Sequence, residues 1–153
     1  MRVPRKPQLD MLTGMARSAR HQLIASMGLG KSGALLLHGG AIEYYQGRWP
    51  GMLIAAPLQV CYAWRNEIPL WRPDLRVNLI CGTMEQRKLA VATPGDINVV
   101  SYDTLPWLKV NGPANWAEAF GRFMVCDEST RIKRTRASWQ TSSLGKRWLR
   151  TDG

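Results

Sequence analysis

The chain has 153 residues, a net charge of +10, three cysteines and 45% hydrophobic residues. These values fit one compact domain and exclude both a disordered tail and a miniprotein held together by disulfides. The basic excess lies at the two ends of the sequence. Residues 1–20 carry 5 Lys or Arg against 1 acid, residues 21–130 carry 9 against 9, and residues 131–150 carry 7 against none. This distribution predicts a polyanionic partner that binds at particular surfaces.

The sequence indicates neither a membrane segment nor an export signal. The longest apolar stretch, residues 52–64, is interrupted by Pro57 and Gln59 and is shorter than the roughly 20 residues that cross a bilayer. Polar residues follow the basic N-terminus where a signal peptide has its apolar core. We therefore expect a reducing, cytoplasmic location and no membrane partner. The cysteines lack the close paired spacing of a zinc site and are predicted to be buried thiols: Cys61, Cys81 and Cys126.

Short apolar runs alternate with helical stretches along the chain, a pattern typical of an α/β fold with a mostly parallel sheet. In chain order, the pattern predicts a helix over 10–20, a strand over 21–25, a helix over 31–45, a strand over 52–56 and a helix over 58–68. It continues with a strand over 77–81, a helix over 83–92, a strand over 97–101, a helix over 115–120 and a strand over 123–126. Because the strands are almost continuously apolar, we expect helices on both faces of the sheet.

Two of the predicted helices contain residues that bear on their packing or on where they end. In helix 58–68 and just beyond it, four apolar residues recur at spacings of 3, 4 and 3, which places them on one buried face: Cys61, Trp64, Ile68 and Trp71. Pro69 is expected to end or kink this helix near Ile68, because proline lacks the backbone N–H. Gly39 and Gly40 weaken helix 31–45 by about 1 kcal/mol each relative to alanine, which predicts an early end.

Residues 25–32, Ala-Ser-Met-Gly-Leu-Gly-Lys-Ser, fit the phosphate-binding loop pattern except that Ala25 replaces its first glycine. The run lies between a predicted strand and a predicted helix, as the pattern requires. The backbone N–H groups of such a turn form an anion cradle at the start of the helix. Lys31 would then contact the β- and γ-phosphates of a nucleotide, and the Ser32 hydroxyl would bind Mg²⁺. The alternative is a plain strand-to-helix turn with a solvated lysine.

Two carboxylates, Asp127 and Glu128, directly follow the apolar strand 123–126. The carboxyl ends of parallel strands are where such sheets bind ligands, so this pair is expected at the same edge as the phosphate loop. Asp127 would hold Mg²⁺ through water, and Glu128 would orient or deprotonate an attacking water. The alternative is that both carboxylates cap the next helix or are solvated at a strand end.

These motifs resemble those of the first RecA-like domain of superfamily 2 helicases and translocases, in particular the Swi/Snf-type group and its small phage-encoded relatives. Residues 27–32 resemble motif I of that group, and residues 54–57 resemble motif Ia, which lies against the nucleic-acid backbone in the family. Residues 99–102 resemble a later strand-end segment on the same side, and residues 127–133 resemble motif II with its basic continuation. Gln8 resembles the glutamine that reads adenine in the family.

The resemblance implies a RecA-like P-loop NTPase domain over residues 1–153, with ATP and Mg²⁺ as cofactors. It assigns ATP binding to one loop and one outlying residue: Gln8, Ala25, Met27, Gly28, Leu29, Gly30, Lys31 and Ser32. It gives catalytic roles to Lys31, Asp127 and Glu128 and places Mg²⁺ at Ser32 and Asp127. Nucleic acid, DNA in preference to RNA, is expected at Pro57, Gln59, Ser101, Tyr102, Arg131, Lys133, Arg134, Arg136, Lys146 and Arg147.

The chain departs from the family pattern in two places. Motif II reads Asp-Glu-Ser-Thr over residues 127–130, whereas the common forms continue with Ala and then His or Asp. Residues 148–153 lie where the motif III strand is expected, without its Thr-Gly-Thr-Pro-like ending. We therefore expect an incomplete first lobe that turns over ATP poorly without a second RecA-like lobe, in cis or in trans, and its arginine finger. The resemblance implies the cytoplasm of a bacterial or phage-infected cell.

The leading functional hypothesis is the ATP-binding lobe of an ATP-dependent DNA helicase or translocase, in which Mg-ATP hydrolysis is coupled to nucleic-acid binding. The basic segment 131–153 includes Trp139 and Trp148, which could stack on bases or pack in a core. Its charge could also form a solvated face or a face left bare by the second lobe. The alternative function is a non-enzymatic nucleic-acid-binding or regulatory fragment that keeps the fold without motor activity.

Overall fold

The computed structural model describes residues 3–16 and 30–127. The helices in these ranges are α1 Lys6–Ala16, α2 Lys31–Gln46, α3 Leu58–Trp71, α4 Met84–Ala92, α5 Leu105–Asn111 and α6 Trp116–Phe120. The strands are β1 Met52–Ala56, β2 Val77–Ile80, β3 Ile97–Ser101 and β4 Phe123–Cys126. None of the described helices is long and apolar enough to span a membrane.

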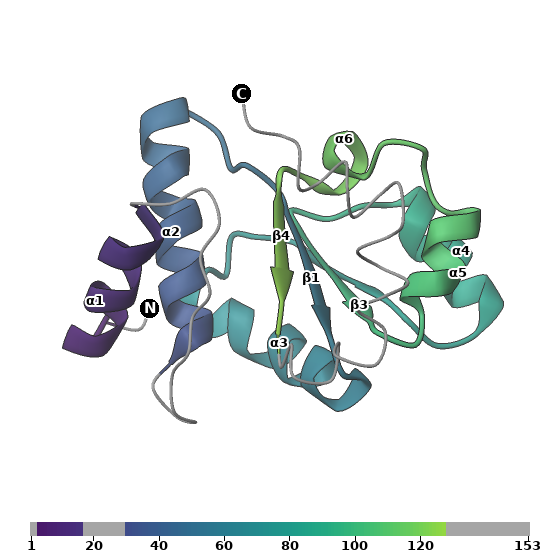
Figure 1. Ribbon diagram of the computed structural model, residues 1–153, viewed down its shortest axis with the longest axis horizontal. Helices are drawn as coiled ribbons and strands as arrows, with labels where there is room; N and C mark the ends of the chain where they lie inside the picture. Colours follow the sequence, from purple (N-terminus) through teal and green to yellow (C-terminus); the bar gives the residue numbers. More distant parts are fainter. Residues whose placement is uncertain (1–2, 17–29, 128–153) are drawn as a thin grey trace.

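The four strands form one parallel sheet in the order β2-β3-β1-β4 (Figure 1). Met52 at the start of β1 is in register with Ile97 of β3 and with Phe123 of β4. At the carboxyl ends of the strands, Ala56 of β1 pairs with Ser101 of β3. The carboxyl ends of β1, β3 and β4 therefore share one edge, which is the edge where parallel sheets bind ligands.

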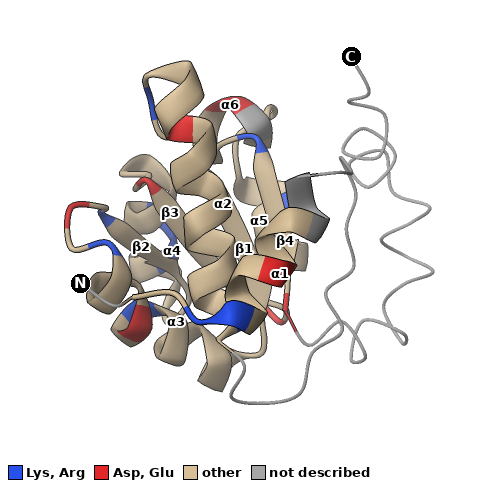
Figure 2. Cartoon of the chain, turned by 90° about the vertical axis from the view of Figure 1, so that its left-hand side faces the viewer, with Lys and Arg blue, Asp and Glu red and all other residues tan. Residues whose placement is uncertain are grey.

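Helices cover both faces of the sheet, as predicted. One face packs against α2 and α3 in the cluster Leu36, Met52, Ile54, Ala56, Cys61, Trp64, Ile68, Trp71, Leu75, Ile97 and Val99. The other packs against α4, α5 and α6 in the cluster Leu53, Ala55, Ile80, Ala90, Val100, Leu105, Leu108, Trp116 and Phe120. Residues of β1 alternate between the two clusters because successive side chains of a strand point to opposite faces. Figure 2 shows acidic and basic residues interspersed over this body.

Most of the predicted elements are confirmed. Strands 52–56, 97–101 and 123–126 have the predicted bounds, and strand 77–81 ends one residue early. Helix 83–92 begins one residue late because Thr83 is its N-cap. The Gln86 N–H donates to the Thr83 hydroxyl at 3.3 Å, and the Thr83 N–H donates to the Gln86 side chain at 2.9 Å. The predicted strand 21–25 lies outside the described residues.

Two expectations about helix ends were wrong, and a third was confirmed. α1 begins at Lys6, four residues before the predicted start, because the Gln8 side chain accepts the Arg5 N–H at 2.8 Å and caps it. α3 continues through Pro69, which costs one backbone hydrogen bond, and so carries Trp71 onto its buried face. The predicted helix 31–45 matches α2, which passes through both of its central glycines and ends at Gln46, so the early end that the glycines indicated does not occur.

Two further points differ from the sequence prediction. The helix α5 was not predicted, because it has seven residues and buries only Leu105 and Leu108, too few to show a period. Cys61 and Cys81 are buried as expected, but Cys126 is exposed. The reason is that Cys126 is the last residue of β4, which is an outer strand of the described sheet.

Candidate functional site

The amino end of α2 carries the part of the predicted phosphate loop that the structure describes. Gly30 precedes the helix in the left-handed conformation, with φ 75° and ψ 44°, which favours glycine. Lys31 and Ser32 form the first turn and are half-buried. The first N–H groups of a helix have no partner within it, so this end favours an anion. Figure 1 shows it at the same end of the molecule as the carboxyl ends of β1 and β4.

Gln8 joins α1 to the phosphate loop. Its side chain is 1% exposed, and its amide nitrogen Nε2 donates to the Gly30 carbonyl oxygen at 3.0 Å. That carbonyl oxygen also accepts the Ala34 N–H at 3.2 Å. A Cβ atom on Gly30 would lie 2.2 Å from Gln8 Nε2, so the contact requires glycine. The arrangement gives Gln8 a structural contact with the loop, whereas its contact with adenine stays a prediction.

Trp71 fills the space behind the first turn of α2. A Cβ atom on Gly33 would lie 2.4 Å from the Trp71 ring and 2.7 Å from Gln8 Nε2, so glycine is needed for this packing. The Trp71 indole nitrogen is buried and has no hydrogen-bond partner among the described residues. The sequence prediction placed Trp71 on the buried face of its helix but missed its contact with the loop region.

Asp127 stands one residue beyond β4 and is held from three sides. Its N–H donates to the Ala55 carbonyl oxygen at 2.8 Å, which extends the ladder between β1 and β4. Its own carbonyl oxygen accepts the Tyr102 hydroxyl at 2.6 Å. Its carboxylate oxygen Oδ2 accepts the indole N–H of Trp64 at 2.9 Å. The carboxylate is thus placed at the carboxyl edge of the sheet, as the sequence predicted, by contacts that the sequence did not reveal.

Cys61 lies on the same face of α3, one turn before Trp64. Its thiol contacts the Ala56 carbonyl oxygen at 3.5 Å and is fully buried. Burial, followed by the neighbouring Cys81, raises the pKa of the Cys61 thiol from 9.0 to about 12. The thiol therefore stays protonated near neutral pH and is a poor nucleophile or metal ligand.

Four of the residues predicted to contact nucleic acid are described, and they differ in accessibility. Gln59, in the first turn of α3, is exposed, whereas Pro57 is buried. The Ser101 side chain is 3% exposed, and its hydroxyl shares a hydrogen bond with Thr104 at 2.8 Å. Tyr102 is half-buried and bonded to Asp127. Of these four side chains, Gln59 is the one presented to solvent.

The other predicted site residues lie outside the described residues. They are the loop residues Ala25, Met27, Gly28 and Leu29, the second carboxylate Glu128, and the basic residues Arg131, Lys133, Arg134, Arg136, Lys146 and Arg147. Their roles stay predictions.

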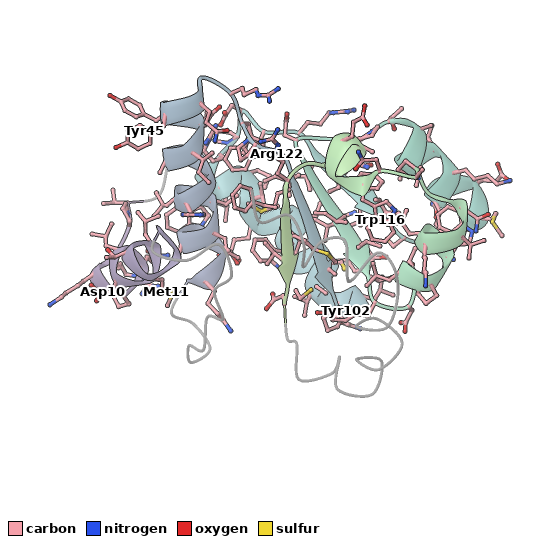
Figure 3. All side chains as sticks on the ribbon, turned by 45° about the horizontal axis from the view of Figure 1, so that its top comes forward. Asp10, Met11, Tyr45, Tyr102, Trp116 and Arg122 are labelled. Atoms are coloured by element: carbon pink, nitrogen blue, oxygen red, sulfur yellow. The ribbon has the colours of Figure 1, made fainter. Side chains whose placement is uncertain are left out.

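A separate hollow lies at the amino edge of the sheet. Its cavity volume is about 580 Å³, and its lining includes Arg48, Trp49, Asp96 and Arg122. Figure 3 shows Arg122 at this edge and Tyr102 at the opposite, carboxyl edge. The hollow therefore lies away from the amino end of α2 and from Asp127, and we do not include it in the candidate site.

Comparison with known proteins identifies the family. A family model described as SNF2-related domain matches residues 11–149. The chain is 31% identical over 144 residues to Helicase swr1 of Aspergillus fumigatus, an alignment that covers 87% of this chain and 8% of that protein. It is 30% identical over 167 aligned positions to putative protein p41 of Acyrthosiphon pisum secondary endosymbiont phage 1, covering 98% of this chain and 35% of that protein.

A solved structure has the same fold. The Sulfolobus solfataricus SWI2/SNF2 ATPase core in complex with dsDNA superimposes with a TM-score of 0.64 at 21% identity, covering 88% of this chain and 28% of that one. The chain thus spans well under half the length of these relatives. The match supports the RecA-like α/β fold, with its parallel sheet, that the motifs implied. With a family model that covers most of its length, the chain belongs to the SNF2-related domain family.

Proposed function

We propose that this chain is the ATP-binding lobe of an ATP-dependent DNA translocase or helicase. The observation that carries the proposal is that the amino end of α2, with Lys31 and Ser32, and the Asp127 carboxylate occupy the same end of the parallel sheet. A nucleotide triphosphate there would meet helix N–H groups, a lysine ammonium and a carboxylate. Relatives named as helicases support an ATP-driven activity.

The described residues suit Mg²⁺ as the metal. Ser32 supplies a hydroxyl and Asp127 a carboxylate, which are the hard oxygen ligands that Mg²⁺ prefers. No group of three or more His, Cys, Asp or Glu in the described ranges is placed to hold a metal ion by itself. Mg²⁺ fits such a site because it commonly binds one or two protein oxygens together with substrate phosphates and water. When bound, it would neutralise charge on the phosphates.

The chain's own residues would divide the remaining work. Lys31 would bind the β- and γ-phosphates, and the loop backbone would hold them in place. Glu128 would orient the attacking water and accept its proton. Preorganised positive charge of this kind is the main source of catalysis in phosphoryl transfer.

Double-stranded or single-stranded DNA is the proposed macromolecular partner. The SWI2/SNF2 ATPase core with the same fold was solved in complex with dsDNA, which supports DNA as the polyanion for this chain. The concentration of seven Lys and Arg in residues 131–150 supports phosphate contacts there. The exposed Gln59 supports a further contact at the carboxyl edge.

A Mg-ATP titration by calorimetry tests the nucleotide site. We expect Lys31→Ala to weaken ATP binding at least tenfold, or about 1.4 kcal/mol, because it removes the phosphate-binding charge. Lys88→Ala, which removes an exposed lysine of α4, is the matched control and should bind ATP as wild type does. Equal ATP affinity in wild type and Lys31→Ala would contradict the proposed site.

The same titration with and without single- and double-stranded DNA separates the two functional hypotheses. Glu128→Gln should keep ATP binding and lose turnover, since it removes the proposed water-orienting carboxylate. If wild type binds DNA but no ATP, and neither Lys31→Ala nor Glu128→Gln changes DNA binding, the non-enzymatic alternative is correct.

A further inference from the structure

Trp64 is a buried tryptophan whose hydrogen bond goes to the carboxylate of the candidate site. It lies on the buried face of α3 and is 3% exposed. Its indole N–H donates to Asp127 Oδ2 at 2.9 Å, across 63 residues of sequence. An indole nitrogen can only donate, and a buried one normally finds an acceptor. Packing of the ring in the core does not by itself require a hydrogen bond to this carboxylate.

The bond from Trp64 adds a restraint on the Asp127 side chain. Ala55 of β1 and Tyr102, which follows β3, hold the backbone N–H and carbonyl of Asp127. Those two bonds fix the main chain but do not set the side-chain torsions. The bond from Trp64 acts on the carboxylate itself and fixes its direction, and it comes from a third element, α3.

We propose that Trp64 is a positioning residue that orients the Asp127 carboxylate toward the Mg²⁺ of bound Mg-ATP. The inference rests on the proposed nucleotide site and adds a residue to it. A donor on Oδ2 selects one rotamer of the carboxylate, so the metal meets a preformed ligand. Outer partners of metal ligands in other proteins typically contribute 10–100-fold to metal affinity.

The mechanism predicts a selective effect on Mg²⁺. Trp64→Phe keeps most of the buried aromatic ring and removes the N–H. In ATP titrations at a series of Mg²⁺ concentrations, we expect the Mg²⁺ concentration for half-maximal enhancement of ATP affinity to rise about tenfold. ATP affinity measured in EDTA should change less than twofold, because the phosphate loop is untouched. A residue that only packs would not produce this split.

Trp116→Phe is the matched control. Trp116 is 3% exposed, as Trp64 is, and packs on the other face of the sheet, in the cluster that holds neither α2 nor α3. The substitution therefore makes the same chemical change at a buried tryptophan without removing a bond to Asp127. Its Mg²⁺ dependence should match that of wild type. If Trp64→Phe and Trp116→Phe shift the Mg²⁺ dependence equally, or neither shifts it, the positioning role is wrong.

A second measurement on wild type does not depend on the folding of a variant. In a ¹H–¹⁵N spectrum with assigned indole signals, the Trp64 signal should move on addition of Mg-ATP and stay in place with ATP in EDTA. An unmoved Trp64 signal at saturating Mg-ATP would overturn the proposal. If wild type binds no ATP in any form, both the proposed function and the role of Trp64 are wrong. If wild type binds Mg-ATP and Trp64→Phe has the same Mg²⁺ dependence as wild type, only the role of Trp64 is wrong.

Discussion

At the scale of single residues, the carboxyl edge of the sheet is built on side chains with fixed partners. Gln8 contacts Gly30, Trp64 contacts Asp127, and the Cys61 thiol contacts the Ala56 carbonyl oxygen. Each partner is a backbone or carboxylate oxygen at or beside a predicted motif. These bonds hold the motifs in place, so the proposed nucleotide would bind at a lower ordering cost.

The raised pKa of Cys61 predicts a stability that depends on pH. Between pH 9.0 and about 12 the thiol ionises in the unfolded chain but stays protonated in the folded chain. The folded state then holds more protons, so its stability relative to the unfolded state falls as pH rises through this window and is fully present below it. We expect wild type to lose up to about 1.4 kcal/mol per pH unit relative to Cys61→Ala in urea unfolding from pH 8 to 10.5.

Ile68→Val is the control for the Cys61 measurement. Ile68 is fully buried in the same cluster and carries no ionisable group. The substitution should lower the free energy of unfolding by about 0.5–1.5 kcal/mol at every pH. A constant difference between wild type and Cys61→Ala over the whole range would show that the thiol ionises alike in both states.

At the scale of elements, the two central glycines of α2 have opposite surroundings. A Cβ atom on Gly39 would lie 2.3 Å from the ring of Trp49, whose indole N–H is bonded to the Asp96 carbonyl oxygen at 3.0 Å. A Cβ atom on Gly40 would meet only the terminal Nη1 of Arg72, at 3.4 Å. The first glycine is thus required for close packing, and the second has room for a methyl group.

This difference predicts that alanine substitutions at two neighbouring positions of α2 change the free energy of unfolding in opposite directions. Gly39→Ala should lower the free energy of unfolding by about 1–3 kcal/mol, because Trp49 must move from an anchored position. Gly40→Ala should raise it by about 0.5–1 kcal/mol through helix propensity. Urea denaturation of both variants measures the pair, and equal shifts in the same direction would contradict the packing argument.

The same glycines show how far the sequence predicts the fold. Strands such as 97–101 were predicted with their bounds because a short apolar run between polar residues is a local signal. The close packing of Gly39 in α2 involves Trp49, which lies outside that helix, and the turn of α3 beyond Pro69 places Trp71 in the core against residues of other elements. Propensity alone therefore ended α3 too early, whereas the predicted helix 31–45 ends within one residue of α2.

The candidate site also has parts that the sequence predicted and parts that it did not. The motifs indicated the strand end at Asp127 and the helix start at Lys31, since both are local patterns. The bonds from Trp64 to Asp127 and from Gln8 to Gly30 join residues 63 and 22 positions apart. They depend on how α3 and α1 pack, so the sequence contained the donors without indicating their acceptors. A buried tryptophan in the helix after β1 was the available signal, since its N–H requires a partner.

At the scale of the whole molecule, the basic excess is separated in sequence from the body that holds the proposed nucleotide site. Residues 21–130 carry equal numbers of acidic and basic residues, which Figure 2 shows interspersed over the described part. The excess lies in residues 1–20 and 131–150. In the proposed function, the balanced body would bind a small anion through helix N–H groups and Lys31, whereas a long polyanion needs many cations on one surface.

This separation predicts that the salt dependence of DNA binding comes from the basic segment. Replacing Arg134, Arg136, Lys146 and Arg147 by Gln should reduce the slope of log K against log salt concentration by about 0.9 for each duplex phosphate that is no longer neutralised. The matched control, with the same charge change on exposed residues of the body, replaces Arg48, Arg65, Lys88 and Lys109 by Gln. Fluorescence anisotropy with labelled duplex DNA should show little change in slope for the control. Equal reductions in both variants would contradict a DNA surface confined to the basic segment, because the exposed cations of the body would then contribute as much as those of the segment.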